Sequence, residues 1–436
     1  MPLPPVASLL ITTTPSRCAN ILTPHMPQKK TRQPPRKQAA PVHRRSLRAN
    51  GTTGPGQHPA KKNKKKLVQR RGKKQWKDFH PSPEDVERGR AALDLEQEVS
   101  DLSEPDLPTT WESRTRTGQR ASVVNGAKRH ARADALKAQR HDATAEMRVF
   151  SLAEAVETRH GQPAQVSAVE PPGPITVLEG DKPRRVKSAD GYDLIYHLPG
   201  AMREQSLAEL VEAATEWGRA CKPSQSVSSD KKGGYKEAGE LVGTTRIVLA
   251  WHAIGHPHDE PGVSADVLRN RLTFNGACTL LEKLDLVNAY VMELVKTIDP
   301  AQYASLQQLY QWRMQKFPSN RALSGLATPQ MFFEGREIQF NRYSKAHWDG
   351  QDPHWAWAII IYFGTFGSCR LKFKQLRTEL VLRPGDAVAI RGQDLLHEAD
   401  DWDFGERHLL VHFTHRSLWN QSKIPLKFSR SAPYSG

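Results

Sequence analysis

The segment Leu380-Val381-Leu382-Arg383-Pro384-Gly385-Asp386-Ala387-Val388-Ala389-Ile390 consists of two short apolar runs joined by a Pro-Gly-Asp turn. Short apolar runs bounded by turn residues are typical of β-strands. We therefore predict strands at 378–383 and 386–390. Further strands are expected on both sides of this segment, at 338–345, 356–363, 370–373 and 408–414. Many short strands with Gly and Pro turns indicate a sandwich or closed double sheet, and not a wound α/β sheet.

The part of the chain before these strands has a mixed pattern. Residues 192–198 and 244–252 read as strands, and a helix capped by Ser206 is expected over 207–220. Apolar residues recur with helical spacing over 279–315, where Asp299-Pro300 divides the pattern into two helices. The expected fold class is α+β, with helices flanking a β-rich core.

The positive charge is concentrated at the N-terminus. The 436-residue chain has a net charge of +16, and residues 1–77 contain 19 Lys and Arg but no Asp or Glu. The rest of the chain has a net charge of −3. Because residues 1–77 have few large apolar side chains, we expect a disordered basic arm. Its clusters Lys61–Lys66 and Arg70–Lys74 favour nuclear import or binding to phosphate backbones; a solvated tail is the alternative.

These patterns give a domain plan. Residues 78–190 are expected to be of low order, with loosely attached helices at 84–100 and 126–158. Residues 191–425 form the folded domain, with helical support at 191–317 and the β-core at 318–425, and 426–436 is a tail. The four cysteines form no CxxC pair, which favours a reducing compartment. No run of eighteen apolar residues exists, so we expect no membrane span. We also expect a monomer.

The candidate chemistry is in His347-Trp348-Asp349-Gly350 and His397. His347 and Asp349 are two residues apart at a predicted strand end, so their side chains face the same side. Two imidazoles and one carboxylate suit Fe(II) and leave coordination positions open for O2. Singly, each histidine reads as an ordinary polar loop residue; jointly, we interpret the three as metal ligands.

Arg407 follows at the start of the last predicted strand. A co-substrate with two carboxylates can chelate a metal at one end, and its far carboxylate then suits a planar, two-pronged guanidinium. The alternative is a surface arginine that caps a turn after Gly405. Arg391 is the competing candidate, but it precedes the distal histidine.

Together with Ile359–Gly364, Leu382–Ile390 and the ending Leu410-Val411-His412-Phe413-Thr414-His415-x-Ser417-Leu418-Trp419, these residues resemble the 2-oxoglutarate- and Fe(II)-dependent dioxygenases. The ending is similar to the TET/JBP branch, which oxidises the 5-methyl group of pyrimidines in DNA, and particularly to its fungal members. The motifs cover about 335–420, and a weaker likeness through Tyr196–Gly200 extends back to about 191.

The resemblance implies a double-stranded β-helix (a jelly-roll, cupin-like core), iron held by His347, Asp349 and His397, and O2 as oxidant. It also implies that Arg407 binds 2-oxoglutarate. The positions matching the branch's base-binding residues are Asp352, Phe413, His415, and either Asn270 or Asn275. Phe413 in the core and His415 at the surface are the alternatives, and His412 competes for either role. Residues 367–374 depart from the family, because they lack the double Gly and the Pro that typically follow the second strand. This departure concerns the shape of the 2-oxoglutarate pocket and not the iron ligands.

The leading hypothesis is therefore a nuclear dioxygenase that oxidises 5-methylcytosine, or thymine, in DNA. The second is a dioxygenase of RNA, protein or a small molecule. The third, from another class, is a non-catalytic nucleic-acid-binding protein. The histidine-rich segment 255–260 is interpreted as a polar loop.

Overall fold

The computed structural model describes residues 116–140, 142–147, 149–159, 171–225, 234–252, 259–317 and 331–429. All of them belong to the unit Lys61–Gly436. The expected disordered arm, the expected helix at 84–100, most of the 255–260 segment and the end of the tail lie outside the described residues.

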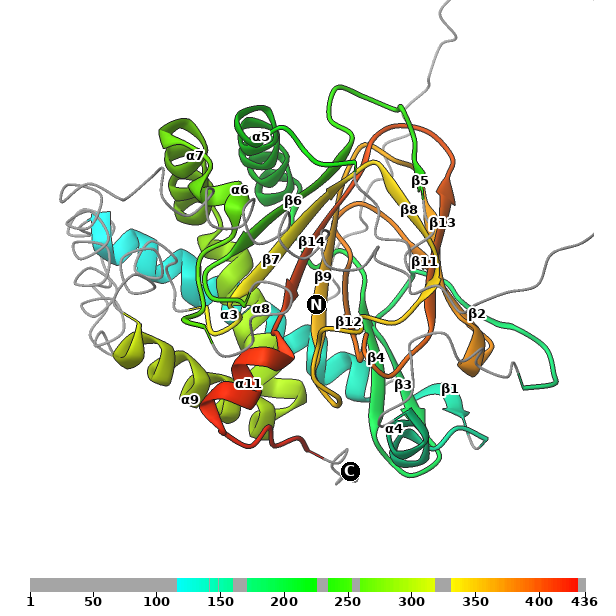
Figure 1. Ribbon diagram of the computed structural model, residues 1–436. Coiled ribbons are helices and arrows are strands. Elements are labelled where there is room, and N and C mark those ends of the chain that lie inside the picture. The colour runs from blue at the N-terminus through cyan, green and yellow to red at the C-terminus, as the bar shows by residue number, and fades with distance from the viewer. Residues whose placement is uncertain are drawn as a thin grey trace, which may run out of the picture. The chain divides into compact units, whose positions relative to one another are not determined.

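Eight consecutive strands between residues 335 and 413 are divided between two facing sheets, and the chain changes sheet after every strand except between β10 and β11, which form a hairpin (Figure 1). They are β7 (Gly335–Phe340), β8 (Arg342–His347), β9 (Ala358–Gly364), β10 (Cys369–Phe373), β11 (Thr378–Leu382), β12 (Ala387–Ile390), β13 (His397–Trp402) and β14 (Arg407–Phe413). The larger sheet contains the order β12-β9-β14-β7, and the smaller one the order β11-β10-β13-β8. This connectivity is that of a jelly roll, so the double sheet expected from the turns is present.

Two strand predictions were wrong in detail. The single strand expected at 338–345 is split between β7 and β8, because Asn341 between them takes a left-handed φ of 51°. Asn is one of the few residues that adopt this conformation readily. Strand β13, with the sequence HEADDW, was not predicted, because it shows no apolar alternation. Pairing with β10 and β8 on both sides holds it in the sheet.

The folded part also begins earlier than predicted. Helix α3 (Arg116–Arg140), α4 (Leu152–Arg159) and strands β1 (Asp142–Met147), β2 (Thr176–Leu178) and β3 (Arg184–Ser188) all precede residue 191. Strand β3 pairs with β4 (Asp193–Leu198), and β4 pairs with β12. The described residues between 116 and 188 thus form regular elements where low order was expected, and the helix expected at 126–158 ends at Arg140, where β1 follows.

The expected helical support at 191–317 also contributes strands. Strand β5 (Gly234–Tyr235) adds to the smaller sheet and β6 (Gly243–Val248) to the larger one. The remaining helices are α5 (Glu204–Cys221), α6 (Ala265–Leu268), α7 (Arg271–Lys283), α8 (Asp285–Ile298), α9 (Pro300–Lys316) and α11 (Arg416–Ser422). The predicted break at Asp299-Pro300 is confirmed, because Asp299 caps α9 and accepts from the Gln302 N–H at 3.1 Å.

The larger sheet lies between two apolar clusters. On strand β9, Ile359, Ile361 and Phe363 pack against the helices, whereas Ile360 and Tyr362 point between the two sheets. Burial on both faces explains the unbroken apolar run of this strand. Figure 1 shows α5, α7, α8 and α9 on the outer side of the larger sheet, away from the smaller sheet, whereas α4 lies beside β3 and β4. No helix in the described part of the chain is long and apolar enough to span a membrane.

Candidate metal centre and co-substrate site

The two candidate histidine ligands face each other across neighbouring strands of the smaller sheet. His347 ends β8 and His397 begins β13, and they are direct partners in the antiparallel register. Their ring centroids are 4.4 Å apart. Asp349 follows β8, and its Oδ1 and Oδ2 lie 3.7 Å from His347 Nε2 and 3.6 Å from His397 Nε2. One ligand atom from each of the three residues lies within 4.8 Å of the others.

Backbone carbonyls set the orientation of both imidazoles. His347 Nδ1 lies 2.8 Å from Lys345 O, and His397 Nδ1 lies 2.9 Å from Leu395 O. Only a protonated Nδ1 can donate to a carbonyl, so each neutral ring carries its lone pair on Nε2. Both lone pairs are then on the nitrogens nearest to Asp349. A hydrogen bond of this kind commonly holds the ring of a metal-bound histidine.

Sequence reasoning missed Gly392, which holds Asp349 in place. The Asp349 N–H donates to Gly392 O at 2.9 Å. A Cβ at position 392 would lie 2.3 Å from Asp349 Oδ2, closer than any real contact. The signal was present as a glycine between β12 and the distal histidine, where a close approach of the backbone calls for this residue.

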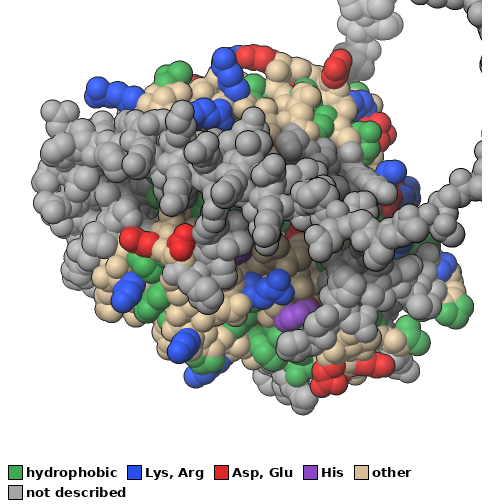
Figure 2. Space-filling model, viewed as in Figure 1, with side chains coloured by type: hydrophobic (Ala, Val, Ile, Leu, Met, Phe, Trp, Pro, Cys, Tyr) green, Lys and Arg blue, Asp and Glu red, His purple; other side chains and the backbone are tan. Residues whose placement is uncertain are grey.

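The donor set fits a non-haem iron. Two neutral imidazoles and one carboxylate converge from one side, and this set leaves further positions available to other ligands. His347 and Asp349 are partly exposed and His397 is buried. Histidine side chains reach the surface on the face in Figure 2, where Lys and Arg are scattered among acidic and apolar residues.

Arg407 is buried at the start of β14 with only 1% of its surface exposed, so the alternative of a surface arginine is wrong. Its guanidinium stacks 4.5 Å from the Trp402 ring and donates to the carbonyls of Asp400, at 3.0 Å, and Arg342. Its Nε has no hydrogen-bond partner among the described residues. Asn341 fixes the backbone, because its Oδ1 accepts from the Arg407 N–H at 2.9 Å.

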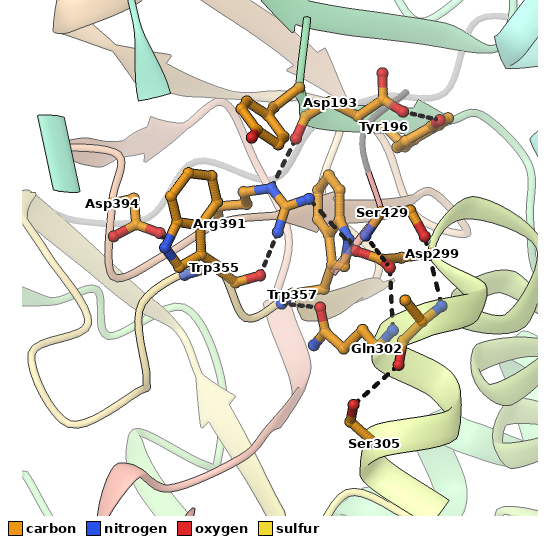
Figure 3. Close-up of polar contacts among 12 residues, drawn as sticks. Asp193, Tyr196, Asp299, Gln302, Ser305, Trp355, Trp357, Arg391, Asp394 and Ser429 are labelled. Atoms are coloured by element: carbon orange, nitrogen blue, oxygen red, sulfur yellow. Dashed lines mark hydrogen bonds and ion pairs between the residues drawn. The ribbon is translucent and has the colours of Figure 1, made fainter. Parts of the chain in front are cut away.

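Arg391, the competing arginine, is fully engaged elsewhere (Figure 3). Its Nε donates to Asp193 O at 2.7 Å, and its terminal nitrogens contact Trp355 O and, at 3.5 Å, Asp299 Oδ2. The guanidinium also stacks 4.2 Å from the Trp357 ring. Each prong already has a protein partner, so Arg391 is a structural residue.

The loop after Asp349 meets the segment that follows β14. Asp352 is buried, and its N–H donates to Asp349 O at 3.0 Å. The Arg416 N–H donates to Gln351 O at 2.9 Å, and the Arg416 side chain donates to Gly350 O at 3.1 Å. The structure therefore brings the segment of His415 next to the loop that carries Asp349 and Asp352.

The hydrogen bonds of His415 define its tautomer. Its Nδ1 accepts from the Ser417 N–H at 3.3 Å and lies 2.7 Å from Ser417 Oγ, so Nδ1 carries no proton. Ser417 Oγ then donates to His415, and it accepts from His252 Nδ1 at 2.7 Å. Burial, followed by the charges of His252 and Arg416, lowers the pKa of His415 to about 4. At neutral pH His415 is therefore uncharged, with its one proton on Nε2.

Alternation along β14 separates Phe413 from His412. Leu409 belongs to the cluster between the sheets and Leu410 to the cluster under the helices. Phe413 shares the face of Leu409 and Arg407, and its ring closely approaches Gly335. His412 is completely buried on the opposite face, near Phe333. His412 therefore does not compete for the roles of Phe413 or His415.

The structure also places the two candidate asparagines and the segment 367–374. The Asn270 side chain caps α7 in a reciprocal pair with Thr273, and Asn275 is exposed on that helix. Neither is brought to the metal ligands by a contact that the structure shows. Within the segment 367–374, Cys369–Phe373 still form strand β10, which pairs with both β11 and β13 and has a register shift against β13 between Cys369 and Leu371.

Comparisons with known proteins give matches among solved structures. No protein-family model and no curated protein matches the chain. Among solved structures, NgTET1 in complex with 5mC DNA is similar, with 16% identity and a TM-score of 0.39 over 62% of this chain and 90% of that chain. An oxidoreductase of the 2OG-Fe(II) oxygenase family from Burkholderia pseudomallei shows 14% identity and a TM-score of 0.25, over 51% of this chain and 88% of that chain. Both TM-scores are below 0.5, so the function has to be argued from the side chains themselves.

Proposed function

We propose that this protein is a 2-oxoglutarate- and Fe(II)-dependent dioxygenase that oxidises the methyl group of 5-methylcytosine, or of thymine, in DNA. One observation carries the proposal. The cross-strand pair His347–His397 presents two Nε2 lone pairs to the Asp349 carboxylate, and backbone carbonyls fix both rings. The resemblance of the sequence to TET/JBP enzymes supports the choice of substrate.

Iron in such a site supplies the activation of O2, coupled to the oxidation of 2-oxoglutarate. His347, Asp349 and His397 would hold the ion, and Gly392 keeps room for the Asp349 carboxylate. Arg407 would bind the far carboxylate of 2-oxoglutarate. Its guanidinium is buried between Trp402 and two carbonyls, where a paired charge is little screened by water.

The target base must leave the DNA stack to reach such a site. His415 presents an Nε2–H donor at neutral pH, which suits a carbonyl oxygen of the base. The Asp352 carboxylate suits the exocyclic amino group that cytosine has and thymine lacks. Phe413 would contact the base face, since it lies on the inward side of β14.

The direct test is incubation of the purified protein with Fe(II), 2-oxoglutarate and a duplex containing 5-methylcytosine, with products measured by mass spectrometry. Oxidised 5-methylcytosine is expected from the wild type and from Glu240→Gln, an exposed control that pairs with Arg219 outside the site. Succinate formation without a DNA product would indicate a dioxygenase with another substrate. DNA binding without any succinate would indicate a non-catalytic binding protein.

The role of His415 has its own test. Ser417→Ala removes the hydroxyl that joins His415 to His252, while the Ser417 N–H remains. We expect a shift of the His415 ring toward a tautomer mixture, seen by ¹⁵N NMR, and a higher KM for DNA with unchanged iron binding. An unchanged KM after an observed tautomer shift would remove His415 from base recognition.

We also propose that the basic arm at 1–77 contacts DNA and directs nuclear import. Deleting it should lower DNA affinity and flatten the dependence of affinity on salt, because fewer phosphate-bound counterions are released. Single-turnover oxidation should be nearly unchanged. Equal salt slopes with and without the arm would contradict DNA contact, and an unchanged cellular distribution would contradict the import role.

A further inference from the structure

Arg336 on β7 is buried without a hydrogen-bond partner. Only 1% of its surface is exposed, and none of its three guanidinium nitrogens has a partner among the described residues. It lies on the helix-facing side of the larger sheet, like its strand neighbours Ile338 and Phe340. This is the face opposite to Arg407, so Arg336 takes no part in the proposed co-substrate site.

The surroundings of Arg336 add positive charge. His412 is its direct partner across the β7–β14 ladder and is completely buried. Arg313 of α9 is also completely buried; it donates to Phe332 O at 3.0 Å, but its Nε and other terminal nitrogen have no partner among the described residues. The charge of Arg313 and, more strongly, burial lower the pKa of Arg336 to about 9. Arg336 therefore stays protonated at neutral pH.

One buried carboxylate, that of Glu334, lies near Arg313. Glu334 is completely buried, and its oxygens accept from Thr414 Oγ at 3.0 and 3.1 Å and from the His415 N–H at 2.5 Å. Its charge interacts with Arg313. Burial and the charge of Arg336 lower the pKa of His412 to about 3, so this ring is neutral. Burial raises the pKa of Glu334. The four residues Arg313, Glu334, Arg336 and His412, called here the Arg336 cluster, thus carry at least one excess positive charge, namely one with Glu334 ionised and two with Glu334 protonated.

A buried excess charge is costly unless it is paired. Water can satisfy the nitrogens of Arg336, but it does not neutralise the net charge. A ligand with one negative charge does both. All four members are at most 1% exposed, so the ligand must be small.

We propose that the Arg336 cluster binds a small monovalent inorganic anion of the chloride type behind strands β7 and β14. The anion accepts from the guanidinium of Arg336, with Arg313 and a neutral His412 N–H as further donors. The site is structural. It joins β7 to the end of β14 and so supports Thr414 and His415, which follow directly on the chain.

Thermal unfolding of the full-length protein tests this site. We compare sodium chloride with sodium gluconate at equal ionic strength, since gluconate is too large for a closed site. Chloride should raise the Tm by at least about 2 °C. Arg336→Met should lose this difference. The matched control Arg246→Met should keep it, because Arg246 on neighbouring β6 is partly exposed and already paired with Glu337 at 2.7 Å.

An equal Tm in the two salts for the wild type, or the same difference in Arg336→Met, would overturn the proposal. Crystallography of the wild type gives an answer that does not depend on the folding of a variant. Protein refolded and crystallised in sodium bromide should show an anomalous peak within hydrogen-bond distance of Arg336. Density for water without an anomalous peak would also overturn the anion site.

Discussion

Two clusters of polar side chains in this fold differ in whether their charged and hydrogen-bonding groups are paired within the protein. In the first, here called the Arg391 clamp, Arg391 contacts Asp299 and the carbonyls of Asp193 and Trp355 (Figure 3). The clamp joins β4, the start of α9 and the approach to β9. In the second, the metal triad His347, Asp349 and His397, three ligand atoms point at one another from the edge of the smaller sheet.

The difference separates a structural site from a chemical one. Asp299 and Arg391 are each about 1% exposed, and their donors and acceptors match. In the triad, His347 and Asp349 are partly exposed, and two imidazole lone pairs face a carboxylate. Lone pairs and a carboxylate repel unless a cation or proton lies among them. A closed, complementary set stabilises the fold, whereas a set of convergent acceptors calls for a metal.

The largest expected effect is on catalysis. His347→Ala should reduce iron affinity and product formation by at least about 100-fold, because one of three protein ligands is lost. The free energy of unfolding without metal should change by less than about 1 kcal/mol, since His347 is partly exposed. Calorimetric titration with Fe(II) under anaerobic conditions and urea unfolding measure the two quantities. Unchanged turnover would refute the assignment of the triad.

The clamp should respond in the opposite way. Arg391→Met leaves the buried Asp299 charge unpaired, so urea unfolding should show a loss of about 3–5 kcal/mol. Adding Asp299→Asn removes that charge and retains the cap of α9, so the double variant should lose less than the two single variants together. Iron affinity of the folded fraction should stay unchanged. Strict additivity would show that the two residues act independently.

Gly392 contributes to the triad through its backbone. Its carbonyl accepts from the Asp349 N–H, and the absence of a side chain leaves room for the Asp349 carboxylate. Gly392→Ala places a Cβ against Asp349 Oδ2 and should weaken iron binding by about 10–100-fold. Gly350→Ala is the matched control in the loop that carries Asp349, since a Cβ there meets nothing within 4 Å. If both variants bind iron equally well, Gly392 does not position Asp349.

Arg407 and Arg391 are both buried, and a Lys substitution at each position distinguishes their proposed roles. Arg407→Lys keeps the charge but loses the planar fork, so the KM for 2-oxoglutarate should rise about 10-fold while iron affinity is retained. Steady-state kinetics with succinate as the readout measures this change. A rise in KM for Arg391→Lys instead would exchange the two roles.

The smallest expected effect is the contribution of the buried His408 to the pH dependence of stability. It lies between the rings of Phe340 and Phe363, and burial, followed by the charge of Arg407, lowers its pKa to about 4. The unfolded chain, with a pKa near 6.5, binds the proton more readily, so stability falls as the pH drops below about 6.5. Between pH 7 and 6 this histidine should cost roughly 0.7 kcal/mol of unfolding free energy. His408→Gln should flatten that slope; an equal slope in both proteins would contradict the assignment.

The sequence predicted much of this arrangement, since several of its patterns are local. Period-two spacing placed His347 and Asp349 on one side, and the turn residues marked the double sheet. Strand β13 and the strands before residue 191 were missed, because their positions depend on partners far along the chain. Arg391 and Arg407 were open alternatives for the same reason: an arginine's role depends on which acceptors the fold brings to it.

By itself, therefore, the sequence determined the types of side chain, their spacing and the alternation of faces along each strand. Only the tertiary structure paired His347 with His397, placed Gly392 against Asp349, and turned Arg336 and His412 away from the site. The physical reason is the separation along the chain over which each interaction acts. Hydrophobic periodicity and turn chemistry act between near neighbours, whereas ligand convergence, burial and charge balance arise from strands that meet only after the chain has folded.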